Sequence, residues 1–524
     1  MSRLGREGLL NGPSREQSRR AVGEVSYLPP NTPLVLTIYL RHRKHARRPG
    51  STIDIAELEQ RFGREELAAE RRRILKRPVA QVRKFAQRHG MKVLDVDFRR
   101  RLVKLRTKVV DAERAFTTRL RLIEHAGDTC HCPTRKPRLP SPLSKIAHAV
   151  VGLDTRSKLG NLRSHAASNG SNALFPSEVA RLYGMSTSGR GAGQCIAIIE
   201  PAGGYDRTDL AAACVAMNLP VPQIRDINVG AGRNRSGADP QADKEVALDI
   251  QVVAAVAPEA HIAVYFTERS EAGLVAGVVE AAHDTNNRPN VIIITWGEPE
   301  TFWQPEARKA FDAALQDAMR LGITVVATAG DDLARERMDD GKVHVNYPAS
   351  SPYVLGCGGT RITLDTANSK IMDEVVWNEG LRGTGGGISD AYAVPAFQRE
   401  TPLPVSLNDG KRRRGVPDVA AAAAEANGYR IVLGGRETVS GGTSAVAPLW
   451  GAFIALLNEQ RGKSLGFINS RLYTQPQLLK PITSGNNADI LSNMGYSAGN
   501  GWSACTGLGS PRGAAIIAAL TAMS

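Results

Sequence analysis

From about residue 173 onward, short apolar runs alternate with longer segments of helical periodicity. The apolar runs are rich in β-branched residues and bounded by polar ones: Cys195–Glu200, Ile262–Phe266, Val291–Thr295 and Ile323–Thr328. The segments of helical periodicity are Arg207–Met217, Lys244–Ala257, Glu271–His283 and Pro305–Leu321. Continuous apolar runs are typical of parallel strands buried on both faces. The alternation therefore predicts a doubly wound α/β domain over residues 173–524, with functional residues at the carboxyl ends of its strands.

The chain before residue 173 has a different pattern, which predicts a smaller α+β domain over residues 31–154. We expect its strands and helices at these positions: strands at Leu34–Leu40, Met91–Phe98 and Arg101–Val109, and helices at Arg64–His89 and Asp111–Leu122. Residues 155–172 are rich in Ser, Asn, Gly and basic residues, which predicts an exposed linker where maturation cleavage would occur. Residues 1–30 are polar and predict a disordered basic tail.

Positive charge is concentrated in the front part of the chain. Residues 1–168 hold 37 Lys+Arg and 16 Asp+Glu, a net +21, whereas the remainder holds 30 and 36, a net −6. Opposite net charges predict two units that attract each other. A nucleic-acid binder is the alternative, but aromatic residues are sparse in the basic part and no nucleic-acid motif is present. We therefore expect no nucleic-acid partner.

Hydropathy and cysteine content narrow the class of protein further. No apolar run approaches the roughly 18 residues of a membrane span, so we expect no membrane partner. The N-terminus lacks the apolar core of a secretory signal. Six cysteines in a chain this long do not predict a disulfide framework. Cys130 and Cys132 flank His131, but no second pair of ligands stands nearby, which favours two loop thiols over a metal site.

The strongest local signal is the segment SGGTSAVAP at residues 440–448, in which Ser444 follows a glycine-rich turn and precedes an apolar helical stretch. At a helix N-terminus, backbone N–H groups favour developing negative charge, which suits a nucleophilic serine. A helix N-cap after a glycine turn explains the segment equally well. A serine nucleophile also needs a base. The histidines beyond residue 168 are poorly placed for that role: His261 in a strand-like run, His283 at a helix end and His344 in a loop.

Carboxylates offer a better base. Glu245 and Asp249 are spaced i,i+4 in a predicted helix with mostly apolar neighbours, so both lie on one face. Burial and mutual repulsion raise the pKa of at least one of them. Asp331 follows the strand-like run ITVVATAG at the carboxyl end of a strand, although Asp332 beside it could serve instead. A solvated acidic edge for the pair, and a loop aspartate that caps the next helix, are the structural alternatives.

These residues resemble the sedolisin family of serine-carboxyl peptidases, and its kumamolisin-like members in particular. The shared motifs are Glu245-x-x-x-Asp249, Asp331 after AG, and GTSAxxP around Ser444. Further blocks match in the same order: IAIIEPAGGYD (196–206), ITWGEPE (294–300), YPASSPYVLGCGGT (347–360), RGVPDVAA (414–421) and GWSACTGLGSP (501–511). The resemblance covers nearly all of residues 173–524, and the front domain resembles the activation domain of the family.

The resemblance implies a fold and a biological setting. The fold would be α/β, with a subtilisin-like doubly wound, mainly parallel sheet in the catalytic domain, preceded by a smaller α+β, ferredoxin-like prodomain. The activity would be that of a serine-type endopeptidase made as a self-processing zymogen. Its partners would be polypeptide substrates and its own prodomain as an intramolecular inhibitor. The enzyme would be a monomer and extracellular, although no signal peptide is recognisable.

The resemblance also implies a role for each site residue. Ser444 would attack the scissile carbonyl, Glu245 would be its general base, and Asp249 would orient Glu245. Asp331, in its protonated form, would stabilise the oxyanion together with the backbone N–H of Ser444. Two further matches extend the network around the base: Glu200 and Trp296. A carboxyl base with a pKa near 4 and a protonated Asp331 predict an activity optimum between roughly pH 3 and 5.5.

The chain departs from the family at a calcium site near the C-terminus. The resemblance aligns the family's ligands with Pro481, Ile482, Gly499, Gly501 and Ser503. Both ligand aspartates of the family are replaced, by Pro481 and Ser503, so that only backbone carbonyls remain. Calcium prefers charged oxygens. We therefore expect no cofactor, with Asp489 as the nearby carboxylate that could partly compensate.

A second departure is Asn346. Close members of the family often carry an aspartate at this position in the substrate cleft, so its loss implies a weaker preference for basic substrate side chains. A pseudo-enzyme that acts as a binding module is the remaining alternative, because the altered calcium site leaves room for impaired stability. The intact set of Ser444, Glu245, Asp249 and Asp331 argues against it.

Overall fold

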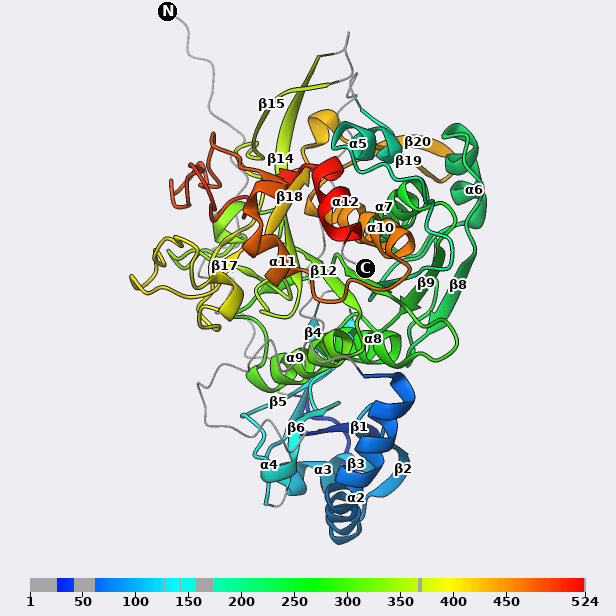
Figure 1. The fold of residues 1–524 in the computed structure, drawn as a ribbon. Helices are drawn as coiled ribbons and strands as arrows, with labels where there is room; N and C mark the ends of the chain where they lie inside the picture. The colour runs from blue at the N-terminus through cyan, green and yellow to red at the C-terminus, as the bar shows by residue number, and fades with distance from the viewer. Residues whose placement is uncertain are drawn as a thin grey trace, which may run out of the picture.

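The computed structural model describes residues 26–41, 62–125, 128–141, 143–156, 173–365 and 370–522. Most of the predicted tail, and the predicted linker from residue 157 onward, lie outside these ranges. The described chain forms two domains that pack against each other (Figure 1). Within these ranges, no helix combines the length and the apolar composition that crossing a bilayer requires.

The larger domain is built on an eight-stranded sheet with the order β15-β14-β12-β10-β7-β9-β8, in which β18 also pairs with β14. Its strands are β7 (Cys195–Glu200), β8 (Ile224–Asn228), β9 (His261–Phe266), β10 (Val291–Ile294), β12 (Thr324–Thr328), β14 (Leu355–Asp365), β15 (Lys370–Val376) and β18 (Val419–Ala422). All neighbours are parallel except β15, which runs antiparallel to β14. The doubly wound prediction is confirmed, and the predicted strands match within one residue at each end.

Helices cover both faces of this sheet. They are α7 (Pro240–Val256), α8 (Glu271–His283), α9 (Pro305–Arg320) and α10 (Thr443–Arg461). α7 and α10 pack on one face, and α8 and α9 pack on the other (Figure 1). Along β10, Val291 and Ile293 belong to the first core, whereas Ile292 and Ile294 belong to the second. This two-sided burial explains why the strands are continuous apolar runs rather than alternating ones.

Smaller elements complete the larger domain. The helices are α5 (Pro176–Leu182), α6 (Arg207–Ala216), α11 (Asn469–Thr474) and α12 (Gly513–Thr521). The short strands are β11 (Glu298–Pro299), β13 (Asn346–Tyr347), β16 (Gly387–Ile388), β17 (Gly415–Val416), β19 (Tyr429–Leu433), β20 (Arg436–Ser440), β21 (Leu479–Lys480) and β22 (Ser510–Pro511). They pair as β11-β13, β16-β17, β19-β20 and β21-β22.

The N-terminal domain has a four-stranded antiparallel sheet with the order β2-β3-β1-β6. Its elements are β1 (Pro33–Leu40), α2 (Arg64–Arg88), β2 (Lys92–Asp97), β3 (Leu102–Lys108), α3 (Val109–Phe116), β4 (Leu120–His125), β5 (Asp128–Pro133), α4 (Leu143–Ile146) and β6 (Ala147–Val151). Helices α2 and α3 share a core with one face of this sheet. Tyr39, Leu102 and Ala149 instead pack into the core around α8 and α9, so the sheet docks on these two helices (Figure 1).

One predicted helix in this domain is partly wrong. The expected helix Asp111–Leu122 ends at Phe116, where Thr117 takes a left-handed conformation with φ +52°. The chain then continues as β4, paired with β5 in a hairpin. Thr117 and Thr118 are β-branched, which disfavours extending the helix. The two thiols of Cys130 and Cys132 therefore lie buried in strand β5, not in a loop.

The contact between the two domains contains a buried cluster of charges. Arg71 of α2 and Arg101, which precedes β3, both donate to Asp317 of α9, the latter at 3.0 Å. His283 Nε2, at the end of α8, lies 3.3 Å from Asp317 Oδ2 and 3.2 Å from Arg71 Nη1. All four side chains are buried. At this interface, oppositely charged groups of the basic N-terminal domain and the acidic larger domain thus meet in a few buried ion pairs.

Candidate active site

Ser444 lies in the first turn of α10, with 2% of its surface exposed. The preceding Gly442 has φ +96°, and a Cβ at this position would come 2.3 Å from Asp331 Oδ2. A glycine is therefore required for the turn and for the close approach of Asp331. The sequence expectation of a serine at a helix N-terminus after a glycine turn agrees with this geometry.

Asp331 stands directly against the same helix end. It follows β12, and one of its oxygens, Oδ1, accepts hydrogen bonds from the backbone N–H and the hydroxyl of Thr443, each at 2.8 Å. Its other oxygen, Oδ2, lies 3.3 Å from Arg382 Nη2. The sequence reasoning placed Asp331 correctly at a strand end but missed Arg382. That arginine comes from a loop about 50 residues away, and no local motif pointed to it.

Glu245 and Asp249 both lie on α7, which packs against α10. Glu245 is 8% exposed and Asp249 is fully buried. Burial raises the pKa of Glu245 to about 7, although the facing Ser444 hydroxyl opposes this effect and the charge of Asp331 adds to it. Burial also raises the pKa of Asp249, together with the charges of Glu200 and Glu245. The structure thus brings both carboxyl groups of the i,i+4 pair into the core and faces one of them with Ser444.

Glu200 and Trp296 extend this carboxyl network. Trp296 Nε1 donates to Glu200 Oε2 at 2.8 Å, and the charge of the neighbouring Glu200 adds to the effect of burial on the pKa of Asp249. Thr295 Oγ1 donates to Asp249 Oδ2 at 2.7 Å. Thr295 was not singled out from the sequence, although it lies in the matched block beside Trp296.

Asn346 lies in β13 and donates through Nδ2 to Glu336 Oε2 at 3.1 Å. Glu336 is buried, which raises its pKa, and the neighbouring charges of Asp332 and Asp331 act in the same direction. A carboxyl group therefore remains beside Asn346, although the aspartate of close family members is absent. Sequence reasoning missed Glu336 because it is ten positions away from Asn346 in a long loop.

The segment aligned with the calcium site offers uncharged groups. Ile482 is buried, and the Ser503 hydroxyl pairs with that of Thr506 at 2.9 Å. Asp489 accepts from the N–H groups of Leu491 and Ser492, at 2.7 and 3.0 Å, so it caps its own loop. Across the described ranges, no group of three or more His, Cys, Asp or Glu residues is arranged to hold a metal ion. This donor set does not fit a calcium ion.

Calcium titration tests this mismatch directly. We expect isothermal calorimetry of the mature enzyme to give no saturable heat with Ca²⁺ up to about 1 mM, because the charged oxygens that calcium needs are missing. We also expect the thermal unfolding midpoint to be the same with added calcium and with a chelator. Stoichiometric binding in the micromolar range would contradict this prediction.

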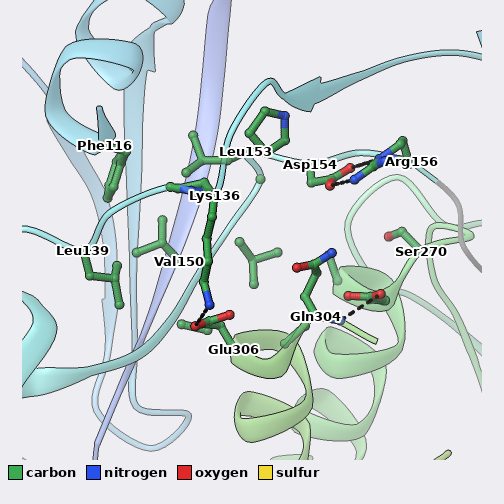
Figure 2. A pocket seen from close by; sticks show the side chains of 18 of the residues that line it. Phe116, Lys136, Leu139, Val150, Leu153, Asp154, Arg156, Ser270, Gln304 and Glu306 are labelled. Carbon is green, nitrogen blue, oxygen red and sulfur yellow. Dashed lines mark hydrogen bonds and ion pairs between the residues drawn. The ribbon is translucent and has the colours of Figure 1, made fainter. Parts of the chain in front are cut away.

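A cavity of about 400 Å³ lies between the two domains, away from Ser444. Figure 2 shows Phe116, Leu139 and Val150 of the N-terminal domain on one side of it and Gln304 and Glu306 of the larger domain on the other. An ion pair of 3.2 Å between Lys136 and Glu306 crosses it. The cavity therefore exists only while the two domains are docked, and its lining contains none of the candidate catalytic residues.

Comparisons with known proteins match both domains. Residues 21–156 match a family model described as the activation domain of pro-kumamolisin. Residues 229–481 match a model of the subtilase family. The chain is 40% identical over 458 residues to kumamolisin from Bacillus sp. (strain MN-32), covering 84% of this chain and 82% of that protein. It is 30% identical over 427 residues to sedolisin from Pseudomonas sp. (strain 101), covering 76% and 71%.

A solved structure agrees with these matches. It is Pseudomonas sedolisin, a serine-carboxyl proteinase, in complex with two molecules of pseudo-iodotyrostatin. The TM-score is 0.60 at 28% sequence identity, and the match covers 68% of this chain and all of that one. The likeness therefore extends over the larger domain at the level of the fold.

Proposed function

The chain belongs to the sedolisin family of serine-carboxyl peptidases, and we propose that it is an acid-acting endopeptidase whose catalytic triad is Ser444, Glu245 and Asp249. It is a serine-type peptidase made as a zymogen with an activation domain. The observation that carries the proposed triad is the Ser444 hydroxyl facing a buried Glu245 at the N-terminus of α10. A buried carboxyl group beside a serine at a helix end is suited to accept its proton.

The proposed mechanism assigns one task to each group. Ser444 attacks the scissile peptide carbonyl while Glu245 accepts its proton, which Glu245 then delivers to the leaving amine. Asp249, held by Thr295, orients Glu245 and shares the charge of the network with Glu200. The developing oxyanion is stabilised by the backbone N–H of Ser444 and by a protonated Asp331.

The pH profile tests this proposal. We expect a bell-shaped kcat/KM on a peptide substrate, with its maximum on the acid side of neutrality. At low pH a protonated Glu245 cannot accept the proton of Ser444, which gives the rising limb of the profile. Because burial raises the pKa of Glu245 to about 7, the optimum should lie above the roughly pH 3–5.5 range expected for an unperturbed carboxyl base. Full activity at pH 8 with little at pH 4 would contradict the mechanism.

The product pattern tests the endopeptidase assignment separately. Mass spectrometry of casein digests should reveal cleavages at internal sites spread along the chains. A ladder of short peptides released only from the N-termini would instead indicate an exopeptidase with the same catalytic residues.

The basic N-terminal domain supports the zymogen model rather than nucleic-acid binding. Its arginines are used at the interface: Arg71 and Arg101 bind Asp317, Arg100 binds Glu280, and Arg64 donates to the backbone carbonyl of Ala282. We propose that the enzyme is extracellular and monomeric, that it cleaves polypeptides, and that acid releases the prodomain before the linker is cut.

A further inference from the structure

Lys244 is a buried lysine whose ammonium group has no partner within the described residues. It lies on α7 directly before the proposed base Glu245, and 7% of its surface is exposed. No described residue makes a hydrogen bond or an ion pair with its Nζ atom. This unpartnered atom is not fully enclosed, so the aliphatic stem is covered while the ammonium reaches solvent. An acceptor that approaches from the solvent side can therefore bind it.

This ammonium group lies beside the residues that form the catalytic centre. Its charge interacts with those of Glu425, Arg382 and Glu245, which come from three separate parts of the chain. Glu425 packs against the turn before Ser444, because a Cβ on Gly441 would come 3.1 Å from Glu425 Cγ. The ammonium therefore lies next to the path of a substrate chain that brings its scissile carbonyl to the serine.

The carboxylates around Lys244 already have other partners. Arg382 Nη1 binds Glu425 Oε1 at 2.8 Å, and its Nη2 atom lies 3.3 Å from Asp331 Oδ2. The carboxyl group of Glu245 faces the hydroxyl of the proposed nucleophile. Of the two cations described here, Arg382 is thus held by two acidic groups, whereas Lys244 is left without an ion pair. The folded chain supplies no charged acceptor for this ammonium among its described residues.

We propose that Lys244 is a specificity-determining residue that binds an acidic side chain of the polypeptide substrate close to the scissile bond. This inference rests on the proposed function, and it names the class of substrate that the site prefers, which is a polypeptide with Asp or Glu beside the cleaved bond. The substrate carboxylate gives the ammonium a charged acceptor, and the contact is strong because it is charge-assisted and partly shielded from water. A basic side chain at the same place meets a like charge and is disfavoured.

The test is the kcat/KM of mature enzyme on internally quenched peptides with amidated C-termini. The assay is run at about pH 6, where substrate Asp and Glu are ionised and lysine is protonated. The peptides of each pair differ only by Glu against Gln, placed in turn at every position that flanks the cleaved bond. At one position we expect the Glu peptide to be cleaved about tenfold faster, because a hydrogen bond to a charged group contributes at least that factor. In Lys244→Met, the ratio should fall to about one.

The ratio within a pair separates recognition from catalysis. Burial raises the pKa of Glu245, and the charge of Lys244 opposes this effect. Removing that charge therefore alters the turnover of both peptides alike and leaves their ratio unaffected. Lys244→Arg keeps a cation and should retain a preference for Glu of about threefold or more. Arg337→Gln is the matched control, because it removes a nearby cation that binds Asp332 at 2.7 Å instead, and it should keep the wild-type ratio.

Three outcomes overturn the proposal. In the first, wild-type enzyme cleaves no Glu peptide faster than its Gln partner. In the second, Lys244→Met keeps the wild-type ratio, and Lys244→Gln provides the same measurement if the methionine variant does not fold. In the third, fast cleavage requires a free C-terminal carboxylate, which peptides with free and amidated C-termini reveal. Failure of the proposed function looks different, because wild-type enzyme would then cleave none of the peptides in a Ser444-dependent manner.

Discussion

Ser444→Ala will abolish casein hydrolysis and will also stop the precursor from processing itself after a shift to about pH 4. The alanine has no nucleophile, so Glu245 has no proton to accept and no acyl-enzyme forms. Loss of the nucleophile in a serine peptidase of related fold lowers kcat by about 10⁶. The measurement is gel electrophoresis and mass spectrometry of wild-type and variant precursor over the same time course, with the new N-terminus expected within residues 155–172.

A second serine provides the matched control. Ser440 is buried just before the glycine turn, four residues from Ser444. Ser440→Ala removes the same hydroxyl from the same segment, so it should process and cleave casein as the wild type does. If Ser444→Ala still produces the mature fragment at the wild-type rate, the proposed nucleophile is wrong, because a folding defect would slow processing rather than preserve it.

The positions of several candidate site residues could be predicted because they depend on local sequence patterns. The i,i+4 spacing of Glu245 and Asp249 on an apolar helix places both side chains on the same helix face and predicts that this face is buried. The strand before Asp331 predicts that Asp331 lies at the carboxyl edge of the sheet. The contacts of Arg382 and Glu336 were not predictable, because each is made across long loops whose conformation no sequence period encodes.

The contacts between the two domains were likewise predictable only in part. Net charges of opposite sign predicted attraction, but the buried contacts are specific ones that the charge count could not locate. Burial lowers the pKa of His283, although its hydrogen bond and charge interaction with Asp317 act in the opposite direction. For Asp317, burial alone would raise the pKa, but Arg101 and Arg71 hold it well below its usual range. These two shifts act on prodomain docking in different pH windows.

The sign of each effect follows from proton linkage. Once the prodomain leaves, Arg71 no longer covers His283, which then takes up a proton below its ordinary pKa of about 6.5. The docked state binds fewer protons, so docking is strongest above that pH and weakens as the pH falls. The depressed pKa of Asp317 contributes docking energy above the ordinary pKa of about 3.9, and this contribution is lost only in stronger acid. As the pH falls, we therefore expect the contribution of His283 to prodomain docking to be lost first and that of Asp317 to be lost last.

Asp317→Asn should make the precursor activate at higher pH and with a shorter lag. The change leaves Arg71 and Arg101 without their carboxylate in a buried interface, which costs about 3–5 kcal/mol. Docking should weaken by roughly 10²–10³-fold or more, since each 1.4 kcal/mol is a factor of ten. The measurement is the pH at which half of the precursor is converted in a fixed time. In the mature enzyme, from which both arginines are gone, the same change should leave kcat/KM near the wild-type value.

Glu306→Gln is the matched control for this interface. Its ion pair with Lys136 crosses the same boundary, but the two side chains are 35% and 70% exposed. An exposed pair contributes about 0–1 kcal/mol, so the activation pH should barely move. If Asp317→Asn and Glu306→Gln activate alike, the buried cluster does not hold the prodomain, and latency must depend on the apolar contacts of Tyr39, Leu102 and Ala149 with the core around α8 and α9.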